Sequence, residues 1–223
     1  MSISRTWRLL AAAALAAVVV AVAAVASSSS SPSGQSDGHV ARSTLFRGIP
    51  EHGGVLGSPA APVTVTEYLD LQCPVCAAAS RDTLPRFVRD YVRTGKVKLA
   101  ARTLQFIGPD SQRAARVAAG AERQGRLWPF LEAFYAAQGP ENSGYVTDEF
   151  LRSVAAAAGV DADAALADAN TAAAQDRLNR ANADAERLGI DSTPTFTVAR
   201  GDGKPQVVDA ASVVAAIQQE LGR

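Results

Sequence analysis

The two cysteines of the 223-residue chain, Cys73 and Cys76, are separated only by Pro74 and Val75. Thiols at this spacing can form a disulfide within one turn of backbone and exchange it with other thiols. A purely structural bridge is disfavoured, because closing so short a loop removes little chain entropy. A structural zinc site needs four ligands, and the two histidines, His39 and His52, lie upstream in linker-like sequence. The pair therefore indicates redox exchange, and we predict neither a metal site nor a cofactor.

The sequence around the cysteines predicts a strand followed by a helix. The β-rich stretch 63–69 follows Pro62, and apolar residues recur at helical spacing from Leu84 until Gly95. Pro74 suits the first turn of such a helix. Because free N–H groups at a helix start stabilise negative charge, Cys73 is expected to be exposed, with a lowered pKa. Cys76, one turn further, is expected to be shielded: the first thiol attacks and the second resolves the mixed disulfide.

The remaining chain is predicted to be mixed. Residues 96–102 indicate a strand, and apolar periodicity predicts helices between about 111 and 188, interrupted by glycines. The aromatic stretch 127–135 is interpreted as the core of these helices, with part of a peptide-binding groove as the alternative. Strands follow at 195–198 and 206–208, and Asp209 is expected to cap a final helix.

With these elements placed, the sequence resembles the DsbA-type branch of the thioredoxin-like superfamily. The resemblance depends on the Cys-Pro-x-Cys motif after a strand and on Glu67, six residues before Cys73. It also depends on Thr193-Pro194 before a later strand and on the long helical stretch between the two halves. It implies an α/β, thioredoxin-like fold over residues 45–223, with a helical insertion at about 110–188 between the two halves of the core.

The resemblance also implies roles for individual residues. Pro194 would be a cis-proline opposite the disulfide, and Thr193 would offer a backbone partner to an extended client and a hydroxyl near Cys76. Pro74 and Val75 would contact the same client. Glu67 would be a buried acid that passes the proton of Cys76, although an acid in a strand can also simply face water. Val75 stands where the best-known DsbA signature has histidine, so the direction of electron flow stays open.

The activity implied is that of an extracytoplasmic thiol–disulfide oxidoreductase, an enzyme that forms disulfides in cysteine-containing exported proteins. Its expected redox partner is a quinone-linked membrane oxidase of the DsbB or VKOR type. A membrane-tethered reductase or isomerase is the nearest alternative. A non-catalytic chaperone or copper-handling module is a further one, and Met1 as the single methionine argues against copper.

The N-terminus carries an export signal. Arg5 and Arg8 precede an uncharged run over 9–26, which has the length of a short membrane anchor and also ends in a small-x-small cleavage pattern. We expect either a single-pass membrane protein with an extracytoplasmic domain or, after cleavage, a secreted or periplasmic protein. Residues 27–44 read as a flexible Ser/Gly/Pro linker. Because 22 basic residues balance 22 acidic ones, no nucleic-acid partner is predicted.

Overall fold

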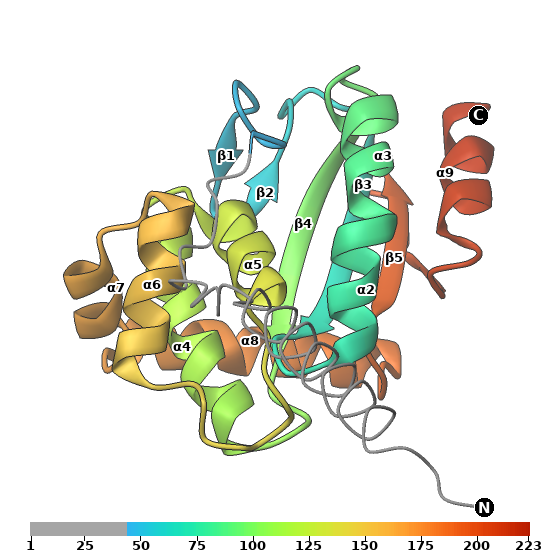
Figure 1. Cartoon of the computed structure of the whole chain (residues 1–223). Helices are drawn as coiled ribbons and strands as arrows, with labels where there is room; N and C mark the ends of the chain where they lie inside the picture. Colours follow the sequence, from blue (N-terminus) through green and yellow to red (C-terminus); the bar gives the residue numbers. More distant parts are fainter. Residues whose placement is uncertain (1–43) are drawn as a thin grey trace, which may run out of the picture. The chain divides into compact units, whose positions relative to one another are not determined.

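The computed structural model describes residues 44–223, shown in colour in Figure 1. The predicted anchor or signal segment and all but the last residue of the predicted linker lie outside the described residues. Within residues 44–223, no helix is both long enough and apolar enough to cross a bilayer.

A mixed sheet forms the centre of the described part of the chain, with strand order β1-β2-β4-β3-β5-β6. Its central strands β3 (Val63–Asp70) and β4 (Val97–Leu104) are parallel, and β5 (Thr195–Arg200) runs antiparallel to β3. The short strands β1 (Glu51–His52), β2 (Val55–Leu56) and β6 (Gln206–Val208) complete the two edges. The helices that join β3 to β4 are α2 (Pro74–Asp82), α3 (Leu84–Phe87) and the π-helical turn η1 (Val88–Val92).

Helices cover both faces of this sheet because alternate residues of β3 point to opposite sides. On one side, Glu67 lies with residues of α2, α3 and α9 (Val213–Leu221) around a small cavity. On the other, Tyr68 packs with Ala181 and Ala185 of α8 (Ala172–Leu188). Because helices cover both faces of the sheet, nearly every residue of β3 is buried, whichever side it points to.

Five helices lie between β4 and β5: α4 (Pro109–Arg123), α5 (Leu127–Ala136), α6 (Asp148–Ala158), α7 (Ala162–Asp168) and α8. Figure 1 shows α4 to α7 gathered beside the β1–β2–β4 side of the sheet, away from α9. The aromatic residues Trp128, Phe130 and Phe134 of α5 are almost completely buried. These aromatic side chains belong to the core, as the first interpretation of this stretch expected.

The observed elements agree closely with the periodicity of the sequence, and the differences have local causes. Asp209 does not cap the last helix: its side chain accepts the N–H of Ser212 at 2.8 Å in a preceding turn, and α9 begins at Val213 without a side-chain cap. The strands β1 and β2 were not predicted, because two residues each are too few to produce a periodic pattern.

Candidate active site

Cys73 and Cys76 lie where the carboxyl end of β3 meets the start of α2. Cys73 is the N-cap of α2, and its sulfur accepts the backbone N–H of Cys76 at 3.4 Å. Pro74 occupies the first helical turn, as predicted, and it has no N–H to leave unpaired there. Both cysteines are free thiols in this structure. A sulfur at a helix start, with its partner one turn inside, is the arrangement that dithiol exchange requires.

The pKa of the Cys73 thiol is lowered to about 6. The largest cause is a hydrogen bond from the Cys76 thiol, which stabilises the Cys73 thiolate; burial acts in the opposite direction. The Thr193 side chain and the backbone N–H groups of Cys76 and Val75 lower this pKa further. A substantial fraction of Cys73 is therefore thiolate at neutral pH, which is the nucleophilic form.

Cys73 was expected to be exposed, and the structure shows that it is buried. Only 5% of its surface is accessible, because the loop before β5 lies against it, and its Sγ is 3.4 Å from the carbonyl oxygen of Thr193. This loop also corrects a second expectation: the Thr193 hydrogen bonds are made to Cys73 and not to Cys76. The Thr193–Pro194 peptide bond is cis, as the resemblance implied.

Cys76 is completely buried, and its pKa is raised. Its hydrogen bond to Cys73 is the largest cause, followed by burial and by the negative charge of Glu67. Glu67 does not face water, since only 7% of its surface is accessible. Burial, and then the charge of Cys73, raise the pKa of Glu67 to about 8. The structure thus brings together two thiols of opposite pKa shift and a carboxyl group able to hold a proton at neutral pH.

The turn between β3 and α2 is held by side chains that were not predicted to matter. The Asp70 carboxylate is fully buried in this turn and receives hydrogen bonds from the loop that follows β4. The Tyr135 hydroxyl donates to the Asp70 carbonyl at 3.1 Å, and Gln138 Nε2 donates to the Leu71 carbonyl at 2.7 Å. Asp70 stands three residues before Cys73, and this proximity to the motif was the one signal in the sequence.

The surface around the cysteines includes exposed apolar groups. Val75 is 59% exposed beside the pair, and Phe106 is 49% exposed in the loop after β4. Phe106 and Ile190 line a groove of about 300 Å³ together with polar residues of α4 and α8. Ile190 lies three residues before Thr193, whose loop lies against Cys73.

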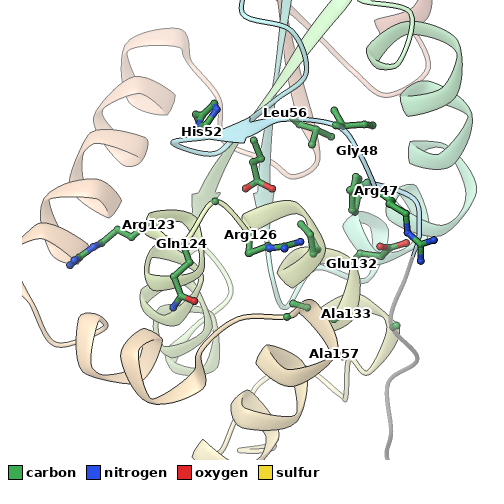
Figure 2. A pocket seen from close by; sticks show the side chains of 18 residues that line it. Arg47, Gly48, His52, Leu56, Arg123, Gln124, Arg126, Glu132, Ala133 and Ala157 are labelled. Carbon is green, nitrogen blue, oxygen red and sulfur yellow. The ribbon is translucent and has the colours of Figure 1, made fainter.

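A larger cavity of about 890 Å³ lies elsewhere, and its lining includes neither cysteine nor Glu67. It is bounded by the N-terminal segment of the described chain, the α4–α5 turn and the end of α6. Figure 2 shows Arg47, Arg126 and Glu132 around it, with Arg123 pointing outward. Among residues 44–223, no group of three or more His, Cys, Asp or Glu side chains is placed to hold a metal ion.

A comparison with known protein families identifies the family of the chain. The family model described as Thioredoxin matches residues 51–217. The chain belongs to the thioredoxin family. Among curated relatives, the probable disulfide bond formation protein D of Bacillus anthracis is 28% identical over 170 residues, which cover 74% of this chain and 77% of the relative.

Solved structures agree with this assignment. BdbD from Bacillus subtilis superposes with a TM-score of 0.67 at 23% identity, covering 78% of this chain and 99% of BdbD. A thioredoxin-like oxidoreductase from Silicibacter pomeroyi has a TM-score of 0.60 at 28% identity, covering 80% of this chain and 96% of that one. The predicted fold, thioredoxin-like with helices inserted between the two halves of the core, is confirmed.

Proposed function

We propose that this thioredoxin-family protein is a thiol–disulfide oxidoreductase that works outside the cytoplasm and forms disulfides in exported proteins. The observation that carries the proposal is the position of Cys73 at the N-cap of α2, with a lowered pKa and with the buried Cys76 directly behind it. The similarity to disulfide bond formation protein D supports the same chemistry.

In the proposed cycle, a client thiolate attacks Cys73 Sγ of the oxidised pair. The Cys73–Cys76 bond breaks, a mixed disulfide forms at Cys73, and Cys76 leaves as a thiolate that takes up a proton. A second client thiolate then attacks the client sulfur of the mixed disulfide, and Cys73 leaves as a thiolate. Two electrons pass from the client to the pair, and the client gains one disulfide.

The pKa shifts suit these steps. Cys73 is a good leaving group because its pKa is low. Cys76 must be protonated once the pair is reduced, because its thiolate would be buried beside Glu67. We assign the donation of this proton to Glu67, whose pKa of about 8 keeps it protonated at neutral pH. The charge of Glu67 raises the pKa of Cys76, which indicates that the two groups lie close together.

The narrow access to Cys73 determines how a client must approach. The client chain would lie along Thr193 and Pro194, whose loop lies against the sulfur, and over the exposed Pro74 and Val75. Phe106 would meet an apolar side chain of the client, since it is exposed and lines the groove described above. Re-oxidation of the pair is assigned to a quinone-linked membrane oxidase of the DsbB or VKOR type.

The decisive experiment is trapping with Cys76→Ala, which removes the resolving thiol. In this variant the Cys73 thiolate attacks a client disulfide and one client thiolate leaves, so client proteins should accumulate as mixed disulfides on Cys73 that reducing agent releases. The Cys73→Ala variant should accumulate none. Equal capture by both variants would show binding without exchange, as a chaperone would give. Full biological function in Cys73→Ala would have the same meaning.

The reduction potential of the pair tests the direction of electron flow. An oxidase should lie near the oxidising end of the range, roughly −120 mV, and a reductase near roughly −270 mV. Val75 in place of histidine makes this measurement necessary. Membrane fractionation and the mass of the mature chain will distinguish the proposed single-pass anchor from cleavage after Ala26.

A further inference from the structure

The side chain of Asp70 is completely buried and accepts four hydrogen bonds. Its Oδ1 accepts the backbone N–H of Gln72 at 2.8 Å and the hydroxyl of Ser111 at 2.6 Å. Its Oδ2 accepts the backbone N–H groups of Phe106 at 2.8 Å and Ile107 at 3.2 Å. A carboxylate that leaves water must recover its solvation from the protein, and here both oxygens are fully used.

These bonds join the turn that carries Cys73 to the loop between β4 and α4. Within the turn, the backbone N–H of Cys73 donates to the carbonyl of Asp70 at 3.0 Å. The opposite side of the turn is held from α5 and the residues after it: Tyr135 donates to the same carbonyl, and Gln138 reaches the carbonyls of Leu71 and Cys73. The turn is thus fixed from two directions, and Asp70 is the member on which most of the bonds converge.

We propose that Asp70 is a positioning residue for the active site, holding the turn so that Cys73 stays at the N-cap of α2 and against Thr193. The proposal deepens the function given above and rests on it for the biological meaning of Cys73 reactivity. The mechanism is geometric, because the sulfur of Cys73 accepts the backbone N–H of Cys76 over a long 3.4 Å hydrogen bond, and this bond stabilises the thiolate. A small shift of the turn weakens this bond and so disfavours the thiolate.

The shape of the site explains why an amide cannot replace the carboxylate. All four partners of Asp70 are donors, and each carboxylate oxygen faces two of them. The Asp70→Asn variant would keep one accepting oxygen and turn an NH₂ group toward two other donors. Two hydrogen bonds would be lost and a buried donor would be left unpaired, so the turn would have to move.

The test measures the alkylation rate of the reduced full-length chain by iodoacetamide as a function of pH, with thermal unfolding in parallel. In Asp70→Asn we expect the midpoint of the Cys73 profile to rise by about one pH unit. From a starting pKa of about 6, the alkylation rate at pH 6 then falls about fivefold, because the thiolate fraction drops from one half to about one eleventh. A merely structural role would lower stability and leave this profile unchanged.

Asp161→Ala is the control. Asp161 caps α7 through the N–H of Ala164 at 3.1 Å, so its replacement by Ala removes a carboxylate hydrogen bond without touching the turn. It should lower the unfolding temperature and keep the Cys73 profile of the parent. If Asp70→Asn does not fold, Ser111→Ala removes one of the four bonds, and the rate at pH 6 should fall about twofold.

A folded Asp70→Asn with the parent profile overturns the proposal. So does an unchanged Ser111→Ala profile where Asp70→Asn is unfolded, or an equal shift in Asp161→Ala. Alkylation needs no client protein, so the outcome is independent of the trapping experiment. A parent chain that traps no clients would remove the proposed function, whereas the positioning of Cys73 by Asp70 would still be decided by the alkylation profiles.

Discussion

Replacing Glu67 by Gln should remove a defined part of the pH dependence of stability. The sign follows from the raised pKa, which is about 8 in the folded protein against 4.5 for an ordinary glutamate. Between these values the unfolded chain has lost the proton and the folded chain has kept it. The folded state therefore binds more protons, and stability falls as the pH rises through this window. Integrated from pH 5 to pH 8, the loss due to Glu67 is about 3 to 4 kcal/mol.

The assay is urea unfolding of the oxidised protein at pH 5, 6, 7 and 8, for the parent and for Glu67→Gln. Oxidation removes the thiols from the titration and with them the charge of Cys73, the smaller of the two causes of the raised Glu67 pKa, so that burial is the cause under test. Glu51 must be taken into account, because burial raises its pKa to about 7, so that its ionisation also lowers stability with rising pH, over an overlapping pH range. The quantity of interest is therefore the difference between the two proteins, in which the Glu51 contribution cancels. If the parent and the variant lose stability in parallel, with a difference below about 1 kcal/mol, then Glu67 is ionised in the folded protein and the reasoning from its burial is refuted.

Three further predictions concern other parts of the molecule. The alkylation rate of Cys73 in the parent should rise through a midpoint near pH 6, whereas a midpoint near pH 9, the value for an ordinary thiol, would contradict the hydrogen bonding described at the start of α2. Val75→His should lower the pKa of Cys73 further and raise the reduction potential of the pair by about 30 mV for each pKa unit, as measured by equilibration with glutathione. An unchanged potential would mean that the exposed residue 75 does not act on the thiolate. Gly120→Ala should destabilise the protein by about 1 to 3 kcal/mol in urea unfolding, because the added Cβ would lie 2.7 Å from the backbone of Ala165 where α4 crosses α7. Unchanged stability would show that the two helices can move apart without cost.

Much of the site and fold was determined by the sequence. The β-rich stretch 63–69, with its partial alternation, and the helical spacing after Cys76 placed the motif at a strand–helix junction, because these periods depend only on local backbone geometry. The position of Pro74 in the first helical turn followed from the chemistry of proline. Gly95 and Gly189 marked the ends of helical segments, since a left-handed residue commonly ends a helix.

Only the tertiary structure decided how these residues meet. The low exposure of Cys73 depends on a loop 120 residues later in the chain, and the burial of Glu67 depends on α2, α3 and α9 covering its face of the sheet. The role we assign to Asp70 arises from donors at Phe106, Ile107 and Ser111, far away in the sequence. Local patterns specify which face of an element is apolar, but burial, pKa and hydrogen-bond partners are set by what packs against that face, and that is fixed only when the whole chain has folded.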